Sequence, residues 1–144
     1  MTLPLKFTLL VQLVSTWSMV GIIWFVQVVH YPLFAEVGGP RYRWYMAGHT
    51  RSTGWVVGPP MLLEAAASVL LVFQAASGVE TRAAWLGVIL VGVIWGSTWL
   101  LQVPRHRQLA DELDPPAHTT LVSTNWIRTI AWSLRGGLAV WWVT

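Results

Sequence analysis

Residues 125–135 read NWIRTIAWSLR and set two arginines inside an otherwise apolar segment. At about 100° per residue, one helix face spanning roughly 80° carries Asn125, Arg128, Trp132 and Arg135. An unpaired charge in the middle of a bilayer costs on the order of 3 kcal/mol or more, so this face must point into the protein. Glu64 is the carboxylate that lies well inside another apolar segment. We therefore predict an ion pair between Glu64 and Arg128.

The composition is that of a polytopic membrane protein. Of the 144 residues, 55% are hydrophobic, 10% are charged and eleven are tryptophan, whereas soluble domains carry about 25% charged residues. Four spans of about 20 residues would take up most of the length, which predicts one domain, residues 1–144, without a soluble module. The absence of cysteine excludes disulfides, thiolate metal ligands and cysteine nucleophiles.

The apolar segments predict an all-α fold, a bundle of four transmembrane helices. The expected spans are residues 7–29, 55–76, 84–103 and about 120–143. The first is expected to be retained, because its apolar run exceeds the about 7 to 15 residues of a signal-peptide core. In the third span, Gly92 and Gly96 have the spacing that allows a second helix to approach closely.

Prolines and a basic aromatic segment mark the predicted span boundaries. Residues 38–46 read GGPRYRWYM, which predicts a short interfacial helix at about residues 40–48, with arginines reaching lipid phosphates. Pro59 and Pro60 are expected to kink the second span or to delay its start. Pro104 is expected to end the third helix before His106.

The distribution of basic residues predicts the orientation of the chain. The connections after the first and third spans contain Arg41, Arg43, Arg51, Arg105 and Arg107, and the opposite side has Lys6 and Arg82. The positive-inside rule then places both termini outside a bacterial cytoplasmic (inner) membrane. The net charge of +3 fits anionic lipid headgroups as the partner rather than nucleic acid.

This topology brings several polar residues to one end of the bundle. We predict a polar vestibule in its cytoplasmic half, with candidate cofactor-binding residues His30, His49, His106, Glu64 and Arg128. Its further polar lining is predicted to be Gln27, Gln102, Asn125 and Arg135. The fourth histidine, His118, is the weakest candidate of its kind.

Two classes of function fit these features. One is an intramembrane oxidoreductase or cofactor-binding protein, in which histidines bind haem, or bind a metal together with Glu64, and arginines neutralise propionates or a quinone oxygen. No His-x-x-His or Glu-x-x-His pair occurs, which disfavours a standard di-iron bundle. The other is a non-enzymatic accessory subunit of a larger membrane complex or homo-oligomer. Transport of protons or of a small solute is a third hypothesis, although the sequence shows no evident inverted repeat.

Four short segments carry a resemblance that covers most of the chain. They are His30-Tyr31-Pro32, Pro60-Met61-Leu62-Leu63-Glu64, Gln102-Val103-Pro104 with His106, and Asn125-Trp126 with Arg128 and Arg135. The chain resembles small uncharacterised bacterial four-helix membrane proteins and, more distantly, the DUF1772 or anthrone-oxygenase-like group. The distant group implies cofactor-poor oxygenation of an aromatic substrate. None of its catalytic motifs is matched residue by residue, so no catalytic residue is assigned and the chain's status as an enzyme stays open.

Overall fold

The computed structural model describes residues 2–75 and 80–144, which form helices and connecting turns with no strand among them. The first helix, α1 (Leu3–Phe25), continues into a π-helical turn, η1 (Val26–His30). After Tyr31 come two 3₁₀ turns, η2 (Pro32–Glu36) and η3 (Gly39–Arg41). The second helix, α2 (Tyr42–Gln74), is 33 residues long.

The second half of the chain repeats this pattern of a helix followed by a π-helical turn. Helix α3 (Thr81–Ser97) runs into the π-helical turn η5 (Thr98–Gln102) and then into the short helix α4 (Val103–Gln108). Helix α5 (Pro115–Trp141) follows, and the Asp114 side chain caps its first turn by accepting a hydrogen bond from the Ala117 amide.

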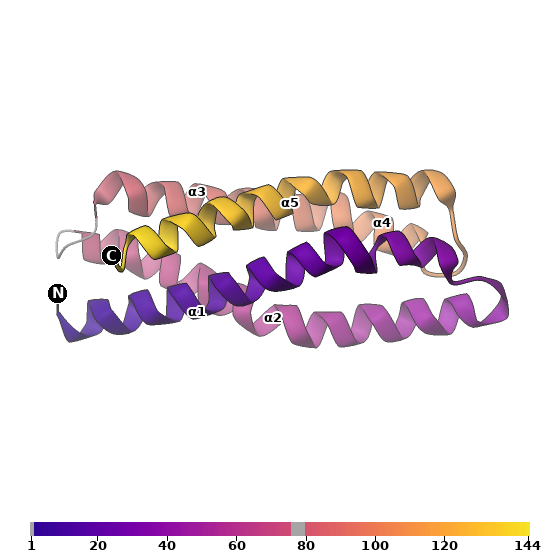
Figure 1. Cartoon of the computed structure of the whole chain (residues 1–144), viewed down its shortest axis with the longest axis horizontal. Coiled ribbons are helices and arrows are strands. Elements are labelled where there is room, and N and C mark those ends of the chain that lie inside the picture. Colours follow the sequence, from indigo (N-terminus) through magenta and orange to yellow (C-terminus); the bar gives the residue numbers. More distant parts are fainter. Residues whose placement is uncertain (1, 76–79) are drawn as a thin grey trace.

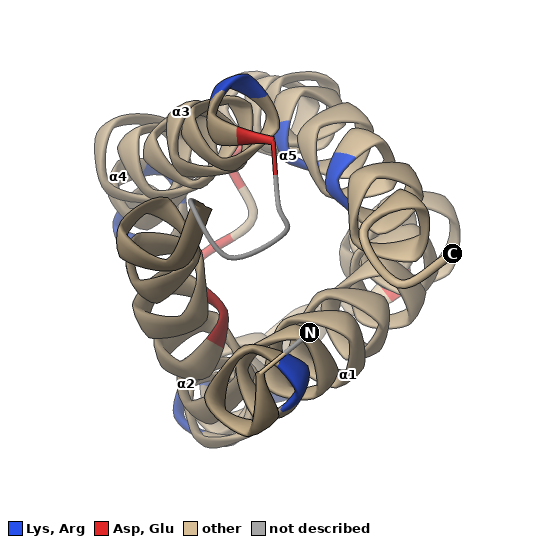
Figure 2. Cartoon of the chain, turned by 90° about the vertical axis from the view of Figure 1, so that its left-hand side faces the viewer, with Lys and Arg blue, Asp and Glu red and all other residues tan. Residues whose placement is uncertain are grey.

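The long helices lie alongside one another with both termini at one end (Figure 1). Seen along the bundle, α1, α2, α3 and α5 surround a common axis in that order (Figure 2), and each contacts the next, with α5 closing the ring against α1. The buried polar side chains of α5, among them Asn125, Arg128 and Arg135, therefore face an interior that is shared by all four helices.

Three helical stretches of the described residues are long and apolar enough to cross a membrane. They are Leu3–Glu36, Gly39–Gln74 and Thr81–Gln108. Each begins before or extends beyond the corresponding span that the sequence predicts, and the predicted end of the second span at residue 76 lies outside the described residues. These stretches indicate a membrane protein with an all-helical fold.

The helices continue through the prolines that were predicted to interrupt them. Residues 42–48 are not a separate short helix but the first turns of α2, which also contains Pro59 and Pro60. Pro104 lies just after η5 within the helical stretch Thr81–Gln108, and the helix continues through His106. These helices extend farther than predicted because none of these prolines breaks them.

The close approach between helices occurs at glycines other than the predicted pair. A methyl group added at Gly92 or Gly96 would meet no heavy atom within 4 Å. At Gly87 the added carbon would lie 2.8 Å from the Trp142 ring, and at Gly136 it would lie 3.2 Å from Val20. The contacts of α3 and α1 with the C-terminal part of the chain therefore depend on Gly87 and Gly136, and Gly92 and Gly96 mediate no close packing within the described part of the chain.

Candidate functional site

Glu64 pairs with Arg135 rather than with Arg128. Arg135 Nε donates to Glu64 Oε1 at 2.7 Å, and each side chain is only 1% exposed. The positions at which α2 and α5 begin explain why Arg135, and not Arg128, lies at the level of Glu64. Glu64 lies 22 residues, or about 33 Å, beyond Tyr42, where α2 begins. Arg135 lies 20 residues, or about 30 Å, beyond the start of α5 at Pro115, whereas Arg128 lies only about 20 Å along it.

The remaining hydrogen-bonding groups of this ion pair are also satisfied. Thr16 donates to Glu64 Oε1 at 2.8 Å and Trp132 Nε1 donates to Oε2 at 2.9 Å. Arg135 Nη2 donates to Ser68 Oγ at 2.8 Å, and Nη1 donates to the Gly87 carbonyl. A buried, charge-neutral network with every partner in place joins the helices and offers no free group to a ligand.

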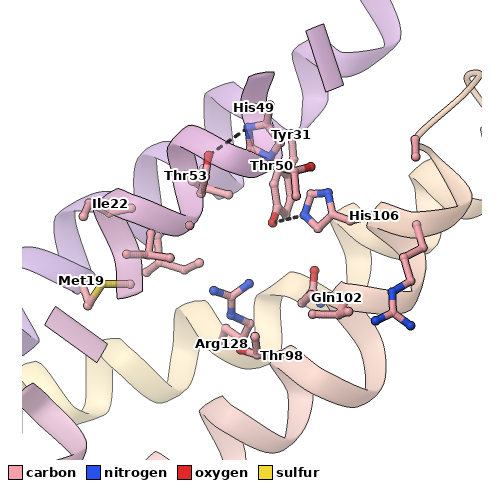
Figure 3. Close-up of a pocket in the computed structure, with 17 residues that line it drawn as sticks. Met19, Ile22, Tyr31, His49, Thr50, Thr53, Thr98, Gln102, His106 and Arg128 are labelled. Carbon is pink, nitrogen blue, oxygen red and sulfur yellow. Dashed lines mark hydrogen bonds between the residues drawn. The ribbon is translucent and has the colours of Figure 1, made fainter. Parts of the chain in front are cut away.

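A separate group of polar side chains surrounds a cavity of about 340 Å³. The cavity lies between α1, α2, α5 and the η5–α4 segment, is lined by none of the residues of the Glu64 network, and has Arg128 projecting into it from α5 (Figure 3). Its polar lining includes Tyr31, His49, Gln102, His106 and Arg128, and its apolar lining includes Met19, Ile22, Ile23, Val26 and Val57. Small-molecule sites have volumes of about 300 to 1,000 Å³, mostly apolar walls and a few convergent polar groups.

Arg128 is a buried cation without a carboxylate partner. Its side chain is 7% exposed, and no acidic side chain of the described residues lies within ion-pair distance of it. Nη1 donates to Asn125 Oδ1 at 3.4 Å, and the guanidinium lies 5.1 Å from the centroid of the Trp132 ring. Its Nε has no hydrogen-bond partner among residues 2–75 and 80–144. Buried donors are nearly always paired, so this one calls for an explanation.

The polar residues around Arg128 hold it in place. Asn125 donates to Gln27 Oε1 at 2.9 Å, and Gln27 donates in turn to the Val122 carbonyl at 3.1 Å. Gln102 donates to Thr124 at 3.0 Å, while its Oε1 accepts no hydrogen bond. The predicted polar lining residues Gln27, Asn125 and Gln102 thus lie beside Arg128, and Arg135 belongs to the other network.

The histidines gather at one end of this cavity. His30 Nε2 lies 2.8 Å from His49 Nδ1, and the His49 and His106 rings are 5.3 Å apart. One ring of the first pair must donate and the other accept, so at least one of them is neutral. His118 Nε2 lies 2.8 Å from the Tyr31 carbonyl. The topology therefore brings all four histidines together, as the alternating helices predicted for His30, His49 and His106.

The predicted metal ligands do not converge on one point. Among residues 2–75 and 80–144, no group of three or more histidine or acidic side chains is arranged to hold a metal ion. His30 and His49 direct nitrogens at each other, and both Glu64 oxygens accept hydrogen bonds in the separate network. The described side chains thus provide individual donors rather than a preformed His/Glu metal site.

Tyr31 is a site residue that the sequence analysis missed. A tyrosine at the end of an apolar span is common at the level of the lipid headgroups, but Tyr31 is only 4% exposed and its hydroxyl lies 2.9 Å from His106 Nε2. Either group can donate in this hydrogen bond, depending on which nitrogen of the His106 ring carries the proton. The π-helical turn η1 directly precedes Tyr31, and η5 ends at Gln102. Such turns alter helix register and are frequent at functional sites.

Comparison of the chain with protein-family models, curated proteins and solved structures finds no match to any of the three. We therefore infer the function from the cavity and from the chemistry of the side chains around it.

Proposed function

We propose that this is an integral membrane protein that binds, in the cavity beside Arg128, an apolar molecule with one anionic oxygen group, a carboxylate or a phenolate. The observation that carries the proposal is the unpaired Nε of the buried Arg128. This role corresponds to the cofactor-binding or oxidoreductase-like class inferred from the sequence.

The charge of Arg128 favours an anion over a neutral ligand. A guanidinium does not lose its proton in proteins, and Glu64, the nearest candidate predicted from the sequence, already neutralises Arg135. Arg128 is buried in the bundle, where the loss of water makes an isolated charge costly, and an anionic oxygen on the ligand would neutralise it there. The planar guanidinium also matches the geometry of a carboxylate.

The other walls of the cavity favour an apolar body on this ligand. Met19, Ile23 and Val57 are among the apolar side chains that line the cavity. The rings of Tyr31 and His106 provide surfaces against which a hydrocarbon or aromatic group can pack. The hydrogen-bonded Tyr31 hydroxyl and His106 imidazole add two polar groups beside the ionised oxygen of the ligand.

Replacing Arg128 with Gln is expected to weaken binding of such a ligand about tenfold or more, because a charge-assisted hydrogen bond is lost. The protein would be titrated in lipid nanodiscs with a brominated fatty acid and, separately, with bromonaphthol. Quenching of tryptophan fluorescence reports occupancy, since Trp132 lies next to the Arg128 guanidinium. The two probes distinguish a carboxylate ligand from a phenolate ligand.

Arg82→Gln is the matched control, since it removes the same charge from an exposed position at the start of α3. It should leave both titrations unchanged. Quenching that does not saturate with either probe, or that is the same in Arg128→Gln and the unaltered protein, would overturn the proposal.

We further propose that α5 is a fourth membrane span and that all four helices cross the bilayer. The polar residues of α5, such as Asn125, Arg128 and Arg135, are buried inside the bundle. Its outward residues include the exposed Ile130 and Leu134. Because the outer face is apolar, lipid would contact hydrophobic side chains even though the average composition of α5 is more polar.

The proposed orientation places both termini outside the cytoplasmic membrane, with the first turns of α2 at the cytoplasmic surface. Arg43 and Arg51 are exposed there, together with Trp44, and they suit the headgroup region. A cysteine introduced at Arg82 should then react with a membrane-impermeant maleimide in intact cells. The chain has no other cysteine. A Cys introduced at Arg105 is the control, and it should react only after the cells are opened; the reverse pattern would invert the orientation.

A further inference from the structure

We infer that the ligand is a long-chain amphiphile whose hydrocarbon tail lies in a groove between α1 and α2 and enters the cavity sideways from the lipid. This inference rests on the proposed function and names the ligand class. The groove is a second hollow of about 500 Å³, and its walls include Val14, Ser18 and Ile22 of α1 and Val56, Pro59 and Leu63 of α2.

The groove and the cavity are neighbours along the same pair of helices. Ile22 lines both of them. From Ile22 the cavity extends toward Val26 and Arg128, and the groove extends toward Leu10 over 12 residues, or about 18 Å, of α1. A ligand with its oxygen at Arg128 would therefore have one continuous apolar path, past the Ile22 side chain, for an extended tail.

The groove opens on the outer surface of the bundle. Val14, Val56 and Leu63 are each more than half exposed, on the side that lipid would cover in a membrane. Pro59 and Pro60 have no N–H to bond the carbonyls four residues before them, which perturbs α2 at this level. The groove thus provides a lateral route from the bilayer, which a membrane-dissolved molecule would use.

The side chains of the groove recognise a hydrocarbon rather than a polar group. None of the residues that line it is charged. Its two hydroxyl groups donate to carbonyls of their own helix, Ser15 to Val11 at 2.7 Å and Ser18 to Val14 at 2.8 Å. The groove therefore suits the tail of the molecule, and the unpaired donor that suits its head is at Arg128.

The experiment compares a tailed with a tailless carboxylate in the Ile22→Trp variant. Bromopalmitate and bromobenzoate would each be titrated by tryptophan quenching in nanodiscs. A larger side chain at Ile22 obstructs the junction, and we expect palmitate to bind roughly tenfold more weakly, a loss within the usual range for overpacking. Because Ile22 also lines the cavity, the comparison with benzoate is decided by a variant of the groove alone.

Two further variants complete the design. Ser18→Phe fills the groove at a distance from the cavity, so it should weaken palmitate and leave benzoate unchanged even if Ile22→Trp does not fold. Leu70→Trp places a large side chain on the exposed surface of α2 outside both hollows, and it should affect neither ligand.

The outcomes separate this inference from the proposed function. If Ser18→Phe binds palmitate as the unaltered protein does, or weakens the binding of both ligands equally, the tail does not occupy the groove. Arg128 would remain the anion site as long as Arg128→Gln still weakens binding of benzoate. If Arg128→Gln changes neither ligand, the proposed function fails first, and the inference fails with it.

Discussion

Replacing Arg135 with Met is expected to destabilise the protein by about 3 to 5 kcal/mol, the cost of leaving one member of a buried ion pair without its partner. Glu64 would keep the hydrogen bonds from Thr16 and Trp132 but would lose the cation at 2.7 Å. Ser68 and the Gly87 carbonyl would lose their donor as well. The unfolding free energy can be measured by titrating the protein in mixed micelles with sodium dodecyl sulfate.

The double variant Glu64→Gln with Arg135→Met tests the pairing itself. It removes both charges and should cost less than the sum of the two single changes. Arg128→Met, seven residues earlier on the same helix, is the control; combined with Glu64→Gln it should be close to additive. Additive costs for Glu64 and Arg135 would show that this pair does not interact, and coupling of Glu64 to Arg128 would restore the pairing predicted from the sequence.

The sequence was sufficient to identify the inward face of residues 125–135 but not its partners. Helical periodicity determines which side chains share a face, and Asn125, Arg128, Trp132 and Arg135 are all buried, as predicted. The partner of each arginine depends on the axial offset of α2 and α5, and therefore on where each helix starts. The sequence placed the start of the second span at residue 55, and α2 begins at Tyr42. The fourth span was expected to begin at about residue 120, and α5 begins at Pro115. The offset between the two helices therefore changes by 13 minus 5, or 8 residues, which is about 12 Å and close to the seven residues that separate Arg128 from Arg135.

The candidate site was likewise predictable in outline. Alternating helices bring His30, His49 and His106 to one end of the bundle, where the structure has them. Hydrogen bonds between side chains were not predictable, because they depend on ring orientation and on the register shifts at η1 and η5. The same reasoning explains why Tyr31 was missed. A tyrosine at a helix end is common at a membrane surface, and only the fold shows that its hydroxyl faces His106.

Replacing Gly87 with Val is expected to destabilise the protein by about 3 kcal/mol, which combines overpacking with a weakened hydrogen bond to Arg135. The first added carbon would lie 2.8 Å from the Trp142 ring and 3.6 Å from Arg135 Nη1. Trp142 is buried and Arg135 is held by Glu64, so neither can move without loss of packing or pairing. Gly92→Val on the same helix meets no atom within 4 Å and is the control; it should change the stability by no more than about 0.5 kcal/mol.

The cost of Gly87→Val should also depend on Arg135. In the background of Glu64→Gln with Arg135→Met, the neighbour of the new valine is an uncharged, flexible side chain, and the Gly87 carbonyl no longer receives the Arg135 donor. Gly87→Val should then destabilise the protein less, because the part of its cost that comes from Arg135 is gone. The part that comes from the clash with Trp142 remains. An equal cost in both backgrounds would mean that Trp142 alone determines the requirement for glycine. A smaller cost in the double-variant background would show that Gly87 helps to hold Arg135 at Glu64.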